Sequence, residues 1–272
     1  MQIGLAVFNG VSPEVLIKSF KKYNITHTFI KSDHPEFDSM MQLFRENDIT
    51  CDNLHAPFKN INAMWGEDEA AGSAMLAELT DSVDKCHKYG IPTTIVHLSS
   101  GRPMPEITPQ GIARYEQLFA YAKEKSVKIA LENLRYAENL AYFMEHYPDC
   151  DYCWDCGHEY AYSHEKYLPK YGHRLAALHL HDNRCGVDTD DHILPFEGAI
   201  PMKEVAKDLA KSGYQGTLML EIGRLIVTHT YDDMSEEDYI DRAVAAANKL
   251  NGLVEAARRE NEKASKRKPS PQ

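Results

Sequence analysis

Long apolar runs and excess positive charge are both missing from this sequence. No stretch of the 272 residues approaches the roughly 18 consecutive apolar residues of a membrane-spanning helix. The N-terminal segment MQIGLAVFNG has no basic flank and no small-residue cleavage site, so we expect no secretory signal and a cytoplasmic location. Thirty Lys and Arg face 41 Asp and Glu, a formal net charge of −11. This balance argues against a broad nucleic-acid surface and leaves only a local basic groove open.

The six cysteines are poorly arranged for a metal cluster. Three of them follow the spacing Cys150-x2-Cys153-x2-Cys156, which invites an iron–sulfur or zinc interpretation. The segment reads as a strand, however, and a spacing of three places Cys153 on the face opposite Cys150 and Cys156. Cys185 is the single candidate for a fourth ligand. We therefore predict reduced thiols, the default in a cytoplasm.

Short apolar runs alternate with longer amphipathic segments along the whole chain. Ser12-Pro13 and Thr108-Pro109 are typical helix starts, with a capping side chain followed by proline. The apolar and β-branched runs predict strands that are buried on both faces of a parallel sheet. These runs are residues 2–7, 26–31, 50–55, 93–98, 127–133, 151–155, 175–181 and 217–222.

Eight strands, each followed by a helix, predict an α/β protein with a single (β/α)8 barrel domain. A doubly wound open sheet would use the same alternation. It normally has a phosphate-binding glycine loop after the first strand, which FNGVSPE does not supply. We expect the barrel over residues 1–262 and a disordered basic tail over 263–272, where the apolar periodicity is lost.

Ionisable side chains recur at the ends of the predicted strands. An unpaired buried charge is costly, and the carboxyl ends of barrel strands meet at one mouth. Three further polar residues lie in the loops nearby, and the whole set predicts a divalent-metal site. Carboxylates favour Mn²⁺, Mg²⁺ or Co²⁺, and added imidazoles favour Zn²⁺. The strand-end residues are His55, His97, Glu132, Asp155, His179, His181 and Glu221, and the loop residues are His158, Asp190 and His192.

The ordered motifs HAPF, VHL, ALEN, DCGH, LHLHDN, DDHxLPxEG and LEIG resemble the xylose-isomerase-like TIM barrel superfamily. That superfamily contains sugar and sugar-phosphate isomerases and epimerases, and also endonuclease IV. The similarity covers nearly the whole chain. The family usually has P-G-x-G in the penultimate loop, whereas this chain has Pro195-Phe196-Glu197-Gly198.

The resemblance to the ketose epimerases implies one divalent ion and a carbohydrate isomerase or epimerase. Two glutamates would act as acid and base around a metal-stabilised enediolate. His158 would bind a substrate oxygen, and Arg184 would neutralise a hydroxyl, carboxylate or phosphate. The sequence leaves open whether His179 or His181 is the ligand, because residues two apart on a strand face the same side. The implied ligands are Glu132, Asp155, His179 or His181, and Glu221, with Glu132 and Glu221 catalytic.

The resemblance to endonuclease IV implies a rival function, a three-zinc phosphodiesterase. All nine matching ligand positions are filled: His55, His97, Glu132, Asp155, His158, His179, Asp190, His192 and Glu221. The loops that would hold DNA are not basic, and Trp65 is the single candidate for an aromatic wedge. A non-catalytic barrel and a sugar phosphatase or lyase are further alternatives.

We favour the isomerase or epimerase, acting on a small sugar or sugar derivative that carries no phosphate. Nucleic acid and membrane are not expected partners, and a homo-oligomer stays open. Aromatic residues in the predicted mouth loops are candidates for packing on sugar C–H surfaces. They are Phe58, Trp65, Tyr160, Tyr162 and Phe196.

Overall fold

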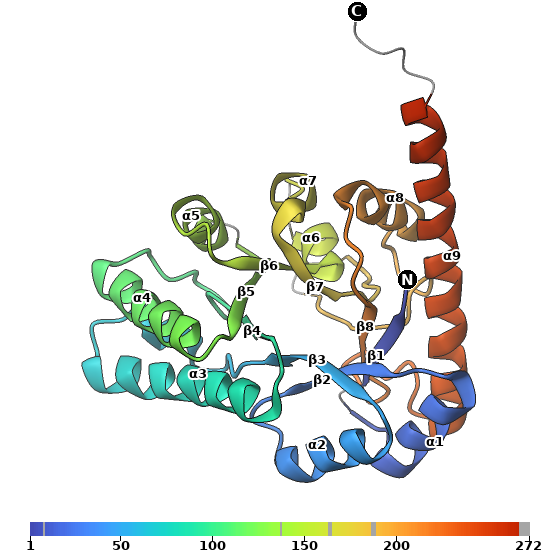
Figure 1. The fold of residues 1–272 in the computed structure, drawn as a ribbon, viewed down its shortest axis with the longest axis horizontal. Helices are drawn as coiled ribbons and strands as arrows, with labels where there is room; N and C mark the ends of the chain where they lie inside the picture. Colours follow the sequence, from blue (N-terminus) through green and yellow to red (C-terminus); the bar gives the residue numbers. More distant parts are fainter. Residues whose placement is uncertain (8, 137, 163–164, 186–188, 267–272) are drawn as a thin grey trace, which may run out of the picture.

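Each apolar run forms a parallel strand in the computed structural model, which describes residues 1–7, 9–136, 138–162, 165–185 and 189–266. The strands lie within two residues of the predicted limits. They form the inner ring of Figure 1, with the helices outside it. The strands are β1 (Ile3–Val7), β2 (His27–Lys31), β3 (Thr50–His55), β4 (Thr93–Val96), β5 (Lys128–Glu132), β6 (Asp151–Asp155), β7 (Leu175–His179) and β8 (Leu218–Ile222).

The helices follow the strands in alternation, and together they confirm the predicted (β/α)8 TIM barrel. Short 3-10 turns, η1 (Ile61–Met64) and η2 (Gly172–Arg174), interrupt two of the connections. The α-helices are α1 (Pro13–Tyr23), α2 (Phe37–Glu46), α3 (Glu69–Tyr89), α4 (Pro109–Glu124), α5 (Glu138–His146), α6 (Cys156–Tyr162), α7 (Leu168–Tyr171), α8 (Met202–Ser212) and α9 (Glu236–Lys266).

The sheet closes on itself through a short contact just beyond the end of β7. The strand order is β7-β6-β5-β4-β3-β2-β1-β8, and β1 pairs with β8 from Ile3↔Leu218 to Val7↔Ile222. Leu180 then bridges to Leu220, and the Glu221 N–H donates to the Leu180 carbonyl at 3.0 Å. The closure brings the carboxyl ends of all these strands to one rim.

The two predicted helix starts differ in their capping. The Thr108 hydroxyl accepts the Gly111 N–H at 3.1 Å and caps α4 as predicted. The Ser12 hydroxyl does not cap α1, because it donates to Glu236 at the start of α9 over 2.7 Å. Ser12 therefore links α1 to α9 instead of capping α1.

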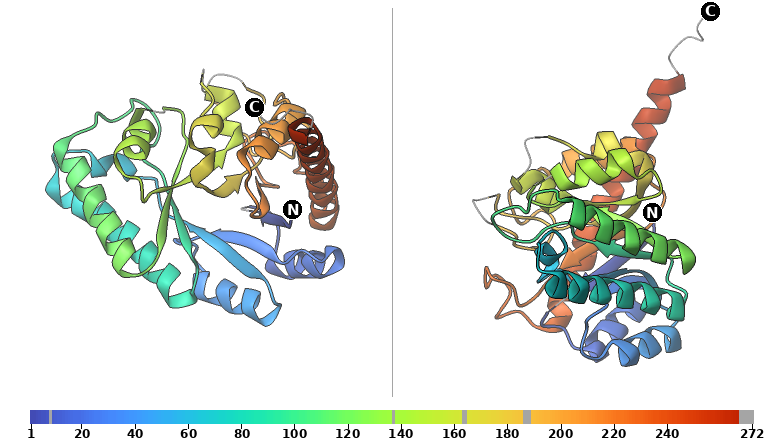
Figure 2. Two further views of the ribbon diagram at one scale, coloured as in Figure 1. Left: turned by 45° about the horizontal axis from the view of Figure 1, so that its top comes forward. Right: turned by 90° about the vertical axis from the view of Figure 1, so that its left-hand side faces the viewer.

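Helix α9 is long and packs against α1 and α8. Its C-terminal turns extend beyond the barrel in Figure 2. The helix reaches Lys266, so the first four residues of the predicted tail 263–272 are helical, and residues 267–272 lie outside the described residues. Within the described ranges, we find no helix with the length and apolar character needed to cross a bilayer.

The core has two parts on opposite faces of the strands. Ile95, Ala130, Cys153 and Ala177 pack together in a small cluster inside the barrel. Cys150 and Cys156 belong to the larger core between the barrel and its helices. The three cysteines therefore face different ways, as their spacing on a strand predicts, and they do not converge on one cluster.

Candidate functional site

Buried imidazoles and carboxylates meet at the carboxyl rim of the barrel, around a cavity of about 160 Å³. The strands supply most of them, and the loop after β7 supplies Asp190 and His192. The rim thus brings together all the predicted metal-capable residues. The lining residues are Asn9, Lys31, His55, Phe58, His97, Glu132, His158, Asp190, His192, Glu221, Gly223 and Ile226.

One group combines three carboxylates with a single imidazole. Potential ligand atoms of Glu132, Asp155, His179 and Glu221 all lie within 4.8 Å of one another. His179 Nδ1 is 3.1 Å from Glu132 Oε2 and 3.2 Å from Glu221 Oε2. Neither ring nitrogen of His179 has a well-formed hydrogen bond among the described residues, although the ring is fully buried. Such an imidazole fits a cation better than it fits a purely structural role.

A second group joins Glu132 to two histidines. His97 Nε2 lies 3.2 Å from Glu132 Oε2, and His55 Nε2 lies 3.5 Å from the same oxygen. His55 Nδ1 is 2.8 Å from the carbonyl of Ala56. A ring nitrogen facing a carbonyl donates its proton there, so Nε2 is the His55 nitrogen on the side of Glu132 that could bind a cation.

A third group contains the other histidine of the LHLHDN motif. His181, Asp190 and His192 form a set with ligand atoms within 4.8 Å, and the His181 and His192 rings stack at 4.2 Å. His192 Nε2 is 3.3 Å from Asp190 Oδ1, and His158 Nε2 is 3.3 Å from Asp190 Oδ2. The fold therefore places His179 and His181 in different ligand groups, a distinction that the sequence alone does not make.

Neighbouring groups of opposite charge lower the pKa of a rim carboxylate and raise the pKa values of two rim imidazoles. Burial raises the pKa of Glu132, but the imidazoles of His179 and His97 lower it more, and the net pKa lies well below the usual range. Burial lowers the pKa of His158, yet Asp155 and Asp190 raise it well above the usual range. Asp190 likewise raises the pKa of His192 to about 9, against the effect of burial. A divalent cation entering the rim must compete with these protons.

Below the rim, Cys153 lies close to the first group. Potential ligand atoms of Glu132, Cys153 and His179 also lie within 4.8 Å of one another. Burial raises the pKa of the Cys153 thiol to about 12, although His179 acts to lower it. The sequence predicts only a reduced thiol at this position.

Asn133 and Asp182 support the site and were not singled out from the sequence. The Asn133 side-chain amide donates to the Asp155 carbonyl at 2.7 Å, and its oxygen accepts the Asp155 N–H at 2.8 Å. Its own carbonyl faces His158 Nδ1 at 3.0 Å. Asp182 accepts backbone N–H groups from the loop that carries Asp190. The available signal was a polar residue directly after a strand-end ligand, in ALEN and LHLHDN.

Lys31 is the one lysine among the described residues that line the cavity, and sequence reasoning missed it. It ends β2, where the run THTFIK carries a lysine at the strand terminus. Its Nζ lies 5.4 Å from the Phe58 ring, which stacks on His97 with centroids 4.3 Å apart. Among the five predicted mouth aromatics, Phe58 is the one that lines the cavity.

Trp65 and Arg184 are engaged elsewhere. Trp65 is 3% exposed and donates from Nε1 to the Leu98 carbonyl at 2.7 Å. It packs so closely that a Cβ on Gly111 would lie 2.2 Å from its ring. The indole of Trp65, the one candidate for an aromatic wedge, therefore packs in the core and is not available to a nucleotide or a sugar. The Arg184 guanidinium pairs with both oxygens of Asp191, at 2.9 and 2.8 Å.

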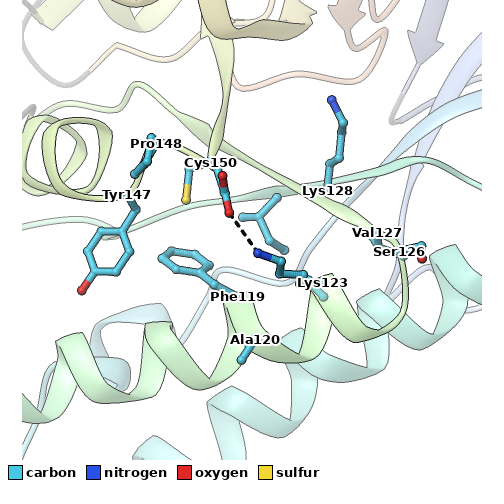
Figure 3. A pocket seen from close by; sticks show the side chains of 12 residues that line it. Phe119, Ala120, Lys123, Ser126, Val127, Lys128, Tyr147, Pro148 and Cys150 are labelled. Atoms are coloured by element: carbon cyan, nitrogen blue, oxygen red, sulfur yellow. Dashed lines mark hydrogen bonds and ion pairs between the residues drawn. The ribbon is translucent and has the colours of Figure 1, made fainter.

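A larger cavity of about 490 Å³ lies at the opposite end of the barrel. Figure 3 shows its walls between the end of α4, the start of β5 and the segment before β6. Phe119 and Tyr147 contribute aromatic surface, and Lys123 pairs with Asp149 at 3.3 Å. Its described lining contains no histidine, so the chemistry of the rim is not repeated there.

Comparison with known proteins finds a relative in sequence. The uncharacterised protein y4fM of Sinorhizobium fredii (strain NBRC 101917 / NGR234) is 28% identical over 199 residues. The match covers 66% of this chain and 61% of the length of that protein, so the chain spans less than two thirds of its relative.

Two solved structures share the fold over almost the whole chain. D-psicose 3-epimerase from Clostridium cellulolyticum H10, solved with D-tagatose, has a TM-score of 0.73 and 16% identity, covering 93% of this chain and 99% of that one. The IOLI protein with a bound zinc atom has a TM-score of 0.74 and 17% identity, covering 92% and 98%. The sequence pattern of one family matches residues 18–251, and the chain belongs to that family, the xylose isomerase-like TIM barrels.

Proposed function

We propose that this protein is a metal-dependent isomerase or epimerase of a small sugar. The observation that carries the proposal is the pair of carboxylates from β5 and β8, Glu132 and Glu221. Both are nearly fully buried, both line the rim cavity, and both lie within 3.2 Å of His179 Nδ1. Two buried carboxylates around one small cavity suit proton removal and return.

The donor set fits a divalent cation. Glu132, Asp155, His179 and Glu221 offer three carboxylates and one imidazole, a set suited to Mn²⁺, Co²⁺ or Zn²⁺. A cation held by these groups would polarise adjacent carbonyl and hydroxyl oxygens of a sugar and acidify the C–H bond beside the carbonyl. The zinc in the IOLI structure supports the proposed divalent cation, and the D-tagatose in the epimerase structure supports the proposed sugar substrate.

The residues of the chain then have distinct tasks. One glutamate takes the proton from carbon, so a C–H bond breaks and a carboxyl O–H bond forms. The other glutamate returns a proton from the opposite face for epimerisation, or the same proton moves to the neighbouring carbon for isomerisation. His158 is our candidate for binding a substrate oxygen. Phe58 and Lys31 line the cavity and suit a sugar C–H surface and an electronegative substituent.

Proton exchange tests this proposal directly. The metal-loaded protein is incubated with a panel of ketoses in D₂O, and deuterium at the carbon beside the carbonyl is followed by NMR. Glu132→Gln and Glu221→Gln should each lower the rate by about three orders of magnitude, since each removes an acid–base group that is also a candidate metal ligand. Glu197→Gln is the matched control, because Glu197 pairs with Tyr231 and Arg242 away from the cavity. Near-native exchange in either rim variant would refute the paired-glutamate mechanism.

A second candidate is a three-zinc phosphodiesterase, and one observation favours it. The described residues of the rim form five ligand groups, three of which share Glu132, and all nine positions of the implied zinc set lie there. Three zinc ions would activate a hydroxide and clamp a phosphodiester. The net charge of −11 and the burial of Trp65 weigh against a DNA substrate. Elemental mass spectrometry separates the two functions: about one ion per chain supports the isomerase, and about three zinc ions support the hydrolase.

A further inference from the structure

Cys153 occupies an unusual place at the floor of the rim site. It lies two residues before Asp155 on β6, so both side chains point into the barrel. Its neighbours in that interior layer are Ile95, Ala130 and Ala177. Among these four side chains, Cys153 is the one that could bind a metal.

The Cys153 thiol lies close to two of the candidate metal ligands, Glu132 and His179. Cys153 pairs in register with Glu132 across β5 and β6, and with Ala177 across β6 and β7, two residues before His179. Ligand atoms of Glu132, Cys153 and His179 lie within 4.8 Å of one another, and none of the three residues is more than 1% exposed. Water has almost no access to this trio.

His179 supplies the independent sign of a ligand. Both of its ring nitrogens are buried and lack a well-formed hydrogen bond among the described residues, although Nδ1 faces Glu132 and Glu221 at 3.1 and 3.2 Å. An unsatisfied buried polar atom is costly, and native proteins keep few of them without a functional reason. An imidazole has two nitrogens but only one metal-binding lone pair in its neutral form, so the bound ion takes one nitrogen. The position of that ion relative to Cys153 decides which metals the site prefers.

We propose that Cys153 is a sulfur ligand at the floor of the metal centre, in a subsite with Glu132 and His179 that selects thiophilic ions such as Zn²⁺, Co²⁺ and Cd²⁺ over Mg²⁺ and Mn²⁺. The proposal rests on the metal dependence proposed above. When the sulfur–metal bond forms, the thiol S–H bond breaks, the proton leaves through the rim cavity that Glu132 lines, and no electron is transferred. Soft sulfur donors favour these ions, whereas carboxylate oxygens also suit Mg²⁺ and Mn²⁺.

Cobalt binding provides the test. Metal-free full-length protein is titrated with Co²⁺ alone while the visible and near-ultraviolet absorption are recorded. Visible d–d bands report that cobalt is bound by any ligands, and a near-ultraviolet thiolate-to-cobalt charge-transfer band reports sulfur. The native protein should give both signals. Cys153→Ala should keep the visible bands, lose the charge-transfer band and bind Zn²⁺ about 10–100-fold more weakly in a chelator competition.

Cys150→Ala is the matched control. Cys150 is another buried thiol next to β6, but it faces the cavity of Figure 3 at the opposite end of the barrel. This variant should keep both absorption signals and the native zinc affinity. If Cys153→Ala does not fold, cadmium-113 NMR of the native protein replaces it, since sulfur ligation moves the resonance strongly to high frequency.

The outcomes separate this inference from the proposed function. Visible bands without a charge-transfer band in the native protein would overturn the sulfur ligand and leave the metal-dependent isomerase standing. A charge-transfer band that survives in Cys153→Ala would also overturn it. Failure of the native protein to bind cobalt, zinc or manganese at all would overturn both.

Discussion

Asp182 should hold the loop that carries Asp190 and His192. Its side chain is fully buried and accepts three backbone N–H groups: Asn183 at 2.8 Å and Ile200 at 3.0 Å on Oδ1, and Phe196 at 2.9 Å on Oδ2. Its backbone pairs in both directions with Ile193. A Cβ on Gly198 would lie 2.3 Å from Oδ1, so the loop approaches as closely as glycine permits.

The structure sets the size of the effect. A hydrogen bond to a charged acceptor contributes about 1.5–3 kcal/mol, and a buried donor left without a partner adds a desolvation cost. Asp182→Ala removes three such bonds at once but also removes a buried charge, which returns part of the loss. We therefore expect the free energy of unfolding to fall by about 3–5 kcal/mol. Asp182→Asn can keep both bonds on Oδ1 and sets its amide against the Phe196 N–H, so a loss of about 1–3 kcal/mol is expected.

Urea unfolding followed by circular dichroism measures this series. Asp149→Asn is the control, because the Asp149 side chain is 83% exposed and its ion pair with Lys123 should contribute no more than about 1 kcal/mol. The expected order of destabilisation is Asp182→Ala, then Asp182→Asn, then Asp149→Asn. If both Asp182 variants unfold within about 0.5 kcal/mol of the native protein, the loop is held by other contacts.

Three other perturbations test the structure around the site. Arg114 is 4% exposed and donates to the carbonyls of three residues in the loop after β3. Arg114→Met should lower the free energy of unfolding in urea by about 3–5 kcal/mol, because it leaves those carbonyls without a donor. Gly157→Ala would place a Cβ 2.0 Å from His181 Cε1 and should lower the metal content at least several-fold in elemental analysis. Gly252→Ala, with no atom in the way, should leave metal content unchanged and stabilise α9 by up to about 1 kcal/mol. Of the six thiols, Cys185 alone is not buried, so a chromogenic thiol reagent at neutral pH should titrate about one thiol in the native protein and six after unfolding.

The sequence predicts the barrel well because strand-forming runs and amphipathic runs alternate without interruption. It also predicts which side chains meet, since strands of a parallel barrel end at one rim. Glu132 and Glu221 are the clearest cases. Each ends an apolar run, and a carboxylate in that position has no structural explanation other than partners supplied by neighbouring strands.

The division of roles within the rim depends on contacts that sequence periodicity does not contain. His179 and His181 are two residues apart, so a strand pattern treats them alike. In the fold β7 ends at His179, whose Nδ1 faces Glu132 and Glu221. His181 Nε2 instead lies 3.2 Å from Asp155 Oδ2 and 4.0 Å from Asp190 Oδ1. Arg184 is a similar case, because its partner Asp191 lies seven residues further along the chain, a spacing at which strand periodicity predicts no contact.

The number of ions that the rim binds depends on whether Glu132 is a ligand of one ion or bridges two. Its Oε2 lies between 3.1 and 3.5 Å from the nearest nitrogens of His179, His97 and His55, and its Oε1 lies 3.3 Å from His158 Nδ1. If the rim holds one ion beside His179, the other histidines serve to orient Glu132. Glu132→Gln and Glu221→Gln should then lose the same single ion.

If instead Glu132 bridges two ions, the two variants must differ. Glu221 belongs to ligand groups that include His179, whereas Glu132 also joins the group with His55 and His97. Glu132→Gln should then lose up to two ions per chain and Glu221→Gln no more than one, as measured by elemental mass spectrometry after gel filtration. An equal loss in both variants, starting from about one ion, refutes the bridging role, and a larger loss in Glu132→Gln refutes the single-ion site. The comparison of two glutamates that look alike in the sequence thus decides between the two chemistries that this barrel could support.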